Sequence, residues 1–118
     1  MSVHDVLVLA EIQRDALADV TLELLAAARS MVATTGGDVV AMILSQDGAG
    51  HAAILTAADR IVVVNDPQLA SYSPEPHLAA IADVIDAEKP RSVLIGATSI
   101  GWDLAPMLAA RLTAPLVT

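Results

Sequence analysis

Short apolar runs recur along the chain and are separated by stretches with a helical period. Four of these runs predict strands; they span residues 5–10, 38–44, 60–65 and 92–95. The last run shows no polar alternation, which is typical of a strand covered on both faces of a parallel sheet. Strands that alternate with helices indicate βαβ units with right-handed crossovers. The pattern therefore predicts an α/β fold, a three-layer Rossmann-like domain with a parallel sheet.

The first predicted helix extends to about residue 34. Its apolar side chains follow a helical period; they are Leu22, Leu25, Ala26 and Met31. Asp19 or Thr21 is suited to cap its start, because either side chain can accept a hydrogen bond from a free backbone N–H group. Gly36 and Gly37 are expected to end it, since glycine readily takes the left-handed conformation that follows a helix.

Two further helices are predicted before the last quarter of the chain. A short helix over residues 51–57 follows a flexible loop, 46–50, which is expected at the carboxyl end of a strand, where it can border a ligand crevice. Three prolines in residues 66–76 favour an extended crossing segment. A helix then begins at Pro76 and ends before Pro90. Its expected apolar stripe is Leu78, Ile81, Ala82 and Ile85.

The last quarter of the chain contains the most distinctive stretch. Strand 92–95 is followed by a loop of small residues, 96–101, and then by a helix. The apolar stripe of that helix consists of Leu104, Leu108 and Leu112. Pro106 is expected close to the helix start, where a missing N–H group is tolerated. Pro115 separates the helix from residues 116–118, which are predicted to begin a further strand, so the sheet is expected to be truncated in its last strand.

The small-residue loop is the most suggestive candidate site. Backbone N–H groups at the start of a helix, with hydroxyl groups beside them, can hold a phosphate. The candidate nucleotide-binding residues are Gly96, Thr98, Ser99 and Gly101. The second explanation is that small residues let the strand and the helix pack closely. We prefer it, because the dinucleotide fingerprint and the phosphate-loop lysine motif are both missing.

Composition narrows the functional classes. The 118 residues suffice for one domain with its own core. Fourteen acidic and six basic residues give a formal net charge of −8, which opposes binding to nucleic acid or anionic lipid. No segment approaches the roughly 18 apolar residues of a membrane span, and the first residues lack the features of a signal peptide. The absence of cysteine excludes disulfides and is compatible with a cytoplasmic location.

The sequence predicts no catalytic residue and no metal site. The histidines are widely spaced, and none pairs with a carboxylate at the spacing of helical metal ligands; they are His4, His51 and His77. A group of carboxylates is expected on a solvated helix face rather than in acid–base chemistry; it comprises Asp83, Asp86 and Glu88. The serines considered as nucleophiles lack the context of a nucleophile elbow; they are Ser30, Ser45 and Ser99.

Trp102 is the only tryptophan in the chain and stands directly after the glycine that ends the small-residue loop. A lone tryptophan in a small domain usually packs at least partly inside the core. It can alternatively anchor a partner protein, because tryptophan is enriched in the energetic centres of interfaces. The core position is the expectation that we prefer.

Residues 96–118 resemble the signature of the first domain of electron transfer flavoprotein alpha subunits. The matching residues read Gly-Ala-Thr-Ser-x-Gly-x-Asp-Leu-Ala-Pro-x-Leu-Ala-Ala-Arg-Leu-x-Ala-Pro-Leu-Val-Thr. Residues 6–11 are similar to the family's opening strand, and residues 20–29 to its first helix. The family usually has a basic residue at the position of Trp102, and often another at the position of Met107. Charged contacts that relatives make there are therefore not carried over to this chain.

The resemblance implies a fold, a function and partners. The fold is a sheet domain of the adenine nucleotide alpha hydrolase-like type, with a short hairpin within residues 11–19. Residues 1–118 would be the N-terminal domain of an alpha subunit, and the second domain, which binds FAD, is absent. The implied function is electron transfer from dehydrogenases to a membrane quinone reductase, in a heterodimer with a beta subunit. This domain would be a scaffold without enzymatic activity and without a cofactor of its own.

A second hypothesis places the chain in a different functional class. The same fold pattern and the small-residue loop are compatible with a free-standing nucleotide sensor that resembles universal stress proteins. Such a protein would bind an adenine nucleotide at the point where the strand order of the sheet reverses. A third hypothesis, a hydrolase, lacks a candidate nucleophile or metal site.

Overall fold

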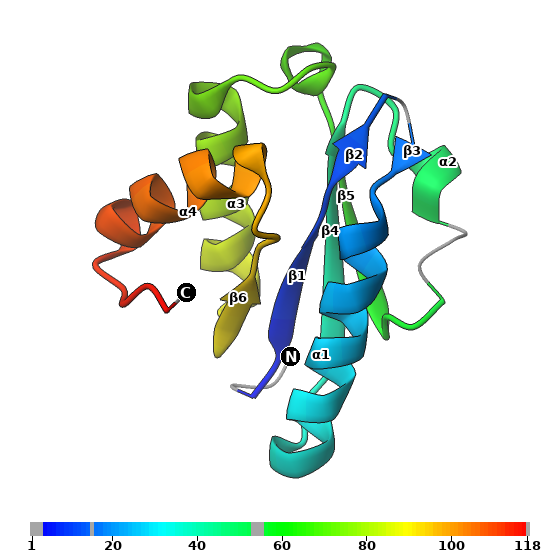
Figure 1. Cartoon of the computed structure of the whole chain (residues 1–118), viewed down its shortest axis with the longest axis vertical. Coiled ribbons are helices and arrows are strands. Elements are labelled where there is room, and N and C mark those ends of the chain that lie inside the picture. Colours follow the sequence, from blue (N-terminus) through cyan, green and yellow to red (C-terminus); the bar gives the residue numbers. More distant parts are fainter. Residues whose placement is uncertain (1–3, 15, 53–55, 118) are drawn as a thin grey trace.

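The computed structural model describes residues 4–14, 16–52 and 56–117. Its main sheet comprises β1 (Val6–Ala10), β4 (Val39–Ser45), β5 (Arg60–Asn65) and β6 (Ser92–Leu94). The strand order is β5-β4-β1-β6, and all three pairings are parallel. The predicted parallel α/β sheet is thus confirmed, and Figure 1 shows the sheet between its helices.

The helical layers lie on both faces of the sheet. The remaining elements are β2 (Ile12–Gln13), β3 (Ala16–Leu17), α1 (Asp19–Thr35), α2 (Ala49–Ala52), the 3-10 helix η1 (Pro67–Leu69), α3 (Pro74–Glu88) and α4 (Ser99–Leu112). α1 covers one face, whereas α3 and α4 cover the other (Figure 1). β2 and β3 form an antiparallel hairpin, as the family resemblance implies.

The core is divided by the alternation of side chains along the two central strands. Val6 and Val8 of β1 pack against α1, whereas Leu7 and Leu9 pack toward α3 and α4. β4 alternates in the same way, and its residues from Val39 to Leu44 are all buried. Strands covered on both faces read as continuous apolar runs, which explains why the sequence pattern located them well.

The buried face of α1 agrees with the prediction at Leu25 but otherwise differs from it. The buried residues are Thr21, Leu25, Ala28 and Val32. The side chain of Leu22 is 52% exposed and that of Met31 is 37% exposed. Buried positions follow the spacing of one helix face, and this face includes a threonine that a count of apolar residues overlooks.

The cap predicted for α1 is also wrong. Ala18 precedes the first helical residue, and no side chain caps the helix there. Instead, Thr21 Oγ1 accepts a hydrogen bond from the backbone N–H of Glu11 at 3.0 Å. The predicted end is confirmed, because Gly36 and Gly37 have φ angles of 78° and 93°.

The predicted helix boundaries shift in three places. α2 begins at Ala49 rather than His51, residues 56–57 form a turn, and residues 53–55 lie outside the described ranges. α3 begins at Pro74, two residues before Pro76. α4 begins at Ser99, so Pro106 lies inside the helix rather than close to its start. Thr98 provides a side-chain cap there, and this cap sets the earlier start.

The end of the chain also departs from the expectation. β6 ends at Leu94, is only half-buried, and forms one edge of the sheet. Residues 116–117 were predicted as the beginning of a strand, but residues 114–117 form no strand, and Thr118 lies outside the described ranges. Thr113 reverses the chain in the left-handed conformation. Leu116 and Val117 then line an apolar cavity next to β6 instead of pairing with it.

A cluster of charges joins the amino-terminal ends of three strands to the end of α3. Nη2 of Arg60 donates hydrogen bonds to the carboxylates of Glu88, at 2.7 Å, and Asp5, at 3.3 Å. Nη1 of Arg60 donates to the carboxylate of Asp38 at 3.4 Å. Asp5 is fully buried and also accepts the N–H of Asp38 at 2.8 Å. Glu88 therefore belongs to a salt-bridge cluster and not to the solvated face predicted for it.

Candidate functional site

The strand order reverses at β1, where open α/β sheets bind ligands at the carboxyl ends of their strands. From β1 the chain proceeds outward to β4 and β5, and it then crosses back to β6 on the other side of β1. A cavity of about 400 Å³ lies at the carboxyl ends of β1 and β4. We call it the switch-point crevice. Its walls come from the β2–β3 hairpin, from the segment between η1 and α3, and from α4.

Glu11 connects this crevice to both neighbouring helices. It follows β1 directly, and only 7% of it is exposed. Its backbone N–H donates to Thr21 of α1, and its carboxylate accepts from the hydroxyl of Thr98 and from Gln13 Nε2 at 3.2 Å. A buried carboxylate needs such donors to offset its loss of hydration. The hydrogen bonds of Glu11 therefore fix the crevice wall to α1 and to the loop before α4.

The small-residue loop packs closely against itself. Thr98 caps α4, because its Oγ1 accepts the N–H of Gly101 at 3.1 Å and its carbonyl accepts the N–H of Trp102 at 2.8 Å. A Cβ atom at Gly101 would lie 1.7 Å from the carbonyl oxygen of Gly96. The small residues thus permit a backbone contact that larger ones would prevent. This geometry favours the packing explanation over a phosphate site.

The candidate loop residues lie beside the crevice but not on its walls. Within the described ranges, α4 lines the cavity with Ile100 and Leu104. Gly96 is buried against Val20, and Ser99 is an exposed first residue of α4. The structure therefore does not direct the four predicted nucleotide-binding residues into the cavity, and their role in binding stays a prediction.

Tyr72 and His77 line the crevice on the side of α3. The Tyr72 hydroxyl donates to Asp103 of α4, and its ring meets that of His77 edge-on at 5.1 Å. Nδ1 of His77 lies 3.1 Å from the carbonyl oxygen of Ser73, which can only accept, so Nδ1 carries the proton. Burial lowers the pKa of His77, and the hydrogen bond to Ser73 partly opposes that effect. The imidazole is therefore favoured in its neutral form.

The Tyr72 contact predicts a titration that can be measured directly. Burial first, and then the hydrogen bond and charge of Asp103, raise the pKa of Tyr72 to about 12. Because the chain contains one tyrosine, phenolate absorbance in the near ultraviolet reports this group alone. We expect a midpoint near 12 in the folded protein and an ordinary midpoint, about 10, in denaturant.

The raised pKa of Tyr72 determines how the stability of the fold depends on pH. Between about pH 10 and pH 12 the folded state retains the phenolic proton longer than the unfolded state does. Stability contributed by this contact is therefore lost as the pH rises through that window. Asp103→Asn removes the charge and should lower the midpoint. An unchanged midpoint in that variant, with folding verified by circular dichroism at each pH, would refute the contact.

The crevice offers limited chemistry. Arg14, at the tip of the hairpin, has φ 51° and is exposed at the crevice. Glu11 is already held by hydroxyl and amide donors. Among the described residues, no group of three or more His, Cys, Asp or Glu side chains could hold a metal ion. The volume of the crevice, about 400 Å³, is within the usual range of binding sites.

The other residues considered from the sequence are dispersed. His4 precedes β1, His51 lies in α2, and only His77 lines the crevice. Asp83 and Asp86 are exposed on α3, as expected. Ser45 contributes to the crevice wall at the end of β4, and Ser30 is exposed on α1.

Trp102 does not occupy the core, contrary to the preferred expectation. Its side chain lies on the outward side of α4 and is 58% exposed. Gly101, Leu104 and Leu108 form the buried face of that helix. The helix register set by the Thr98 cap therefore turns residue 102 outward, which leaves the alternative of a partner contact.

Sequence reasoning missed Glu11, Tyr72 and Arg14 as parts of the crevice. A carboxylate directly after a buried strand was a usable signal for Glu11, because residues at that position face the carboxyl edge of the sheet. The contact of Tyr72 with Asp103 joins positions 31 residues apart, and no local pattern indicates such a pair. Within the described ranges, none of the helices combines the length and the apolar composition needed to cross a membrane.

Comparison with known proteins agrees with the fold. The sequence model of the electron transfer flavoprotein domain matches residues 6–118. The chain is 35% identical to the electron transfer flavoprotein subunit alpha of Bacillus subtilis (strain 168) over 115 residues, which are 96% of this chain and 35% of that protein. It is 39% identical to the subunit alpha of Megasphaera elsdenii over 104 residues, or 86% of this chain and 31% of that protein.

A further relative carries a different name. The acryloyl-CoA reductase electron transfer subunit beta of Anaerotignum propionicum is 34% identical over 113 residues, which are 94% of this chain and 31% of that protein. The chain thus spans about a third of the length of these relatives. The match nevertheless covers nearly all of its own residues and every strand of its main sheet. The chain therefore belongs to the electron transfer flavoprotein domain family.

Proposed function

We propose that this chain is the N-terminal domain of the alpha subunit of a heterodimeric electron transfer flavoprotein, in which it serves as a scaffold. The family match over residues 6–118 is the observation that carries the proposal. Relatives named as alpha subunits are about three times as long as the matched region. That difference supports a second domain in the full-length protein.

The geometry around α4 supports the proposal that FAD binds outside this domain. A flavin dinucleotide needs donors for its pyrophosphate, which are typically free N–H groups at the start of a helix. At the start of α4, the N–H group of Gly101 already donates to the side chain of Thr98. Gly101 also lies against the backbone of Gly96, so a Cβ atom at Gly101 would be 1.7 Å from the Gly96 carbonyl oxygen. We therefore assign FAD to a second domain of the full-length protein and assign no electron-transfer step to the residues of this one.

The remaining parts of the proposal come from the family. Electrons would pass from dehydrogenases through the flavoprotein to a membrane quinone reductase, and the beta subunit would complete the heterodimer. The relative named as an electron transfer subunit of acryloyl-CoA reductase supports a link to an oxidoreductase. A cytoplasmic location and the absence of enzymatic activity in this domain stay predictions.

The adenine-nucleotide sensor is the weaker hypothesis. The switch-point crevice, of about 400 Å³, supports it by size and position. However, the hydroxyl of Thr98 donates to Glu11 and accepts from Gly101. A phosphate bound by Thr98 would have to displace both partners, so the scaffold function is better supported.

Capture of the natural gene product through a tag on its N-terminus tests the proposal. We expect a chain about three times as long as the matched region and an equimolar second subunit of the same family. Denaturing electrophoresis and mass spectrometry of the captured material identify both. A chain that ends near Thr118 and purifies without a second subunit would contradict the heterodimer and favour the sensor.

A further inference from the structure

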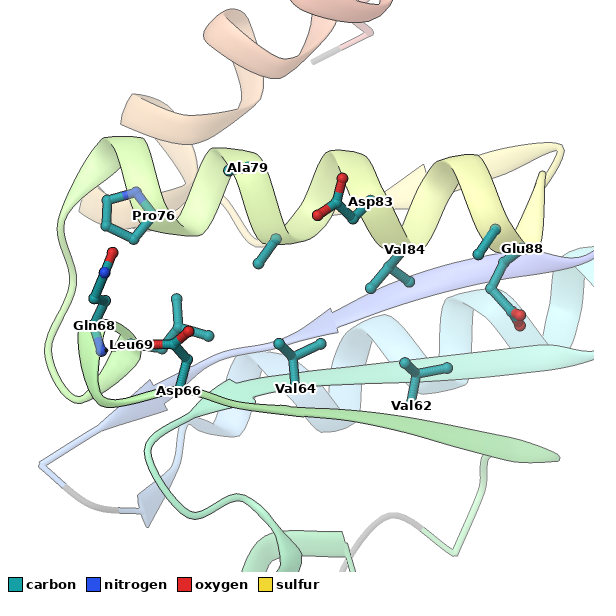
Figure 2. Close-up of a pocket in the computed structure, with 12 residues that line it drawn as sticks. Val62, Val64, Asp66, Gln68, Leu69, Pro76, Ala79, Asp83, Val84 and Glu88 are labelled. Carbon is teal, nitrogen blue, oxygen red and sulfur yellow. Dashed lines mark hydrogen bonds between the residues drawn. The ribbon is translucent and has the colours of Figure 1, made fainter.

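A groove lies between α3 and β5, on the face of the sheet that α3 and α4 cover. Its volume is about 400 Å³. Figure 2 shows Val62 and Val64 pointing from β5 toward α3, with Val84 pointing back toward them. We call this cavity the α3–β5 groove. Its floor is apolar, and it lies on a different part of the fold from the switch-point crevice.

The groove exists because the helical layer ends before the sheet does. β5 is an edge strand that pairs only with β4 in the main sheet of the described residues. On β4, Val40 and Met42 are fully buried on this face, whereas Val62 and Val64 of β5 are only half-buried. A further helix beside α3 would cover the two valines and complete the layer. Half-buried apolar side chains on a groove favour such a helix-in-groove contact.

The charges that line the groove are all of one sign. Asp66, Asp83 and Glu88 contribute to its walls, and no Lys, Arg or His residue does so within the described part of the chain. Asp83 is exposed on α3, Asp66 accepts the N–H of Gln68 at 2.9 Å, and Glu88 accepts from Arg60. An apolar floor with a carboxylate rim is complementary to apolar side chains flanked by cations.

We propose that the α3–β5 groove binds an amphipathic helix of the second subunit, with an apolar stripe toward Val62 and Val64 and Lys or Arg residues toward the acidic rim. This inference rests on the heterodimer proposed above. The contact places the second subunit on the outer side of β5. That position is distant from β6, because β5 and β6 form opposite edges of the sheet.

The test uses the full-length protein, immobilised through its N-terminal tag, with the separately purified second subunit as the probe. Asp83→Lys reverses a rim charge on an exposed position. Asp86→Lys makes the same change on the same helix, at an exposed residue that does not line the groove. Ala79→Trp adds bulk at an exposed position that does line it. Thermal unfolding of each variant verifies the fold.

We expect Asp83→Lys to weaken binding about tenfold and to reduce its dependence on salt, because rim charges act through screened electrostatics. Ala79→Trp should weaken binding at every salt concentration, and Asp86→Lys should bind like the unaltered protein. If the unaltered protein binds the second subunit and both groove variants bind equally well, the groove assignment is wrong. If the unaltered protein does not bind it, the heterodimer is refuted. If the unaltered protein self-associates and Asp83→Lys abolishes that association, the groove binds a second copy of this chain. That result would overturn the proposal.

Discussion

Replacement of Arg60 by methionine is expected to lower the free energy of unfolding by about 3 kcal/mol. The guanidinium lies 3.3 Å from the fully buried carboxylate of Asp5 and 2.7 Å from Glu88. Its removal leaves Asp5 without this cation in a site that water does not reach. We expect a loss of stability at the lower end of the range for broken buried ion pairs. The reason is that the Arg60 side chain is 35% exposed and that Asp5 still accepts a hydrogen bond from the N–H of Asp38.

Arg29→Met is the matched control for this prediction. Arg29 pairs with Asp59, but both side chains are about 40% exposed. Exposed pairs contribute about 0–1 kcal/mol, so this variant should unfold near the urea midpoint of the unaltered chain. The double variant Asp5→Asn with Arg60→Met should recover part of the loss, because it removes the carboxylate charge that Arg60 no longer compensates. A urea midpoint for Arg60→Met equal to that of the control would show that the cluster does not stabilise the fold.

Gly101→Ala is expected to destabilise the chain by about 3 kcal/mol, at the upper end of typical overpacking costs. The added Cβ would lie 1.7 Å from the carbonyl oxygen of Gly96 and 3.2 Å from the side chain of Ile95. Backbone cannot rotate away as a flexible side chain can, so the loop and the start of α4 must move apart. That movement would also disturb the hydrogen bond from Gly101 to Thr98.

Gly50→Ala provides the comparison. Gly50 lies in α2, and a Cβ there would meet no atom within 4 Å. Alanine is favoured over glycine in helices by up to about 1 kcal/mol, so this variant should equal or exceed the stability of the unaltered chain. The melting temperatures of the two variants test this prediction. Equal melting temperatures for Gly101→Ala and Gly50→Ala would refute the close packing of the loop.

The sheet could be predicted from the sequence because its central strands are buried on both faces. Val39 to Leu44 form an unbroken buried run, and burial of that kind leaves an unambiguous apolar pattern. The register of the helices was less predictable. Thr21 takes a buried position on α1 because its hydroxyl binds Glu11, and that contact spans ten residues. A pattern based on apolar residues alone selects the neighbouring face.

The candidate site could be predicted in position but not in detail. The sequence located the loop from Gly96 to Gly101 at the carboxyl end of a strand, and the structure agrees. It did not show that Thr98 is engaged by Glu11, because 87 positions separate the two residues. Trp102 was misplaced because its orientation depends on the exact first residue of α4. Pro106 was misplaced for the same reason.

The visible absorption spectrum of the natural gene product, captured through its N-terminal tag, tests the central claim most directly. The account predicts flavin absorption bands in the captured complex. It also predicts that residues 1–118, purified alone and incubated with FAD, stay colourless after gel filtration. Stoichiometric flavin retained by residues 1–118 alone would contradict the scaffold assignment. A captured protein without flavin would contradict its place in an electron transfer flavoprotein.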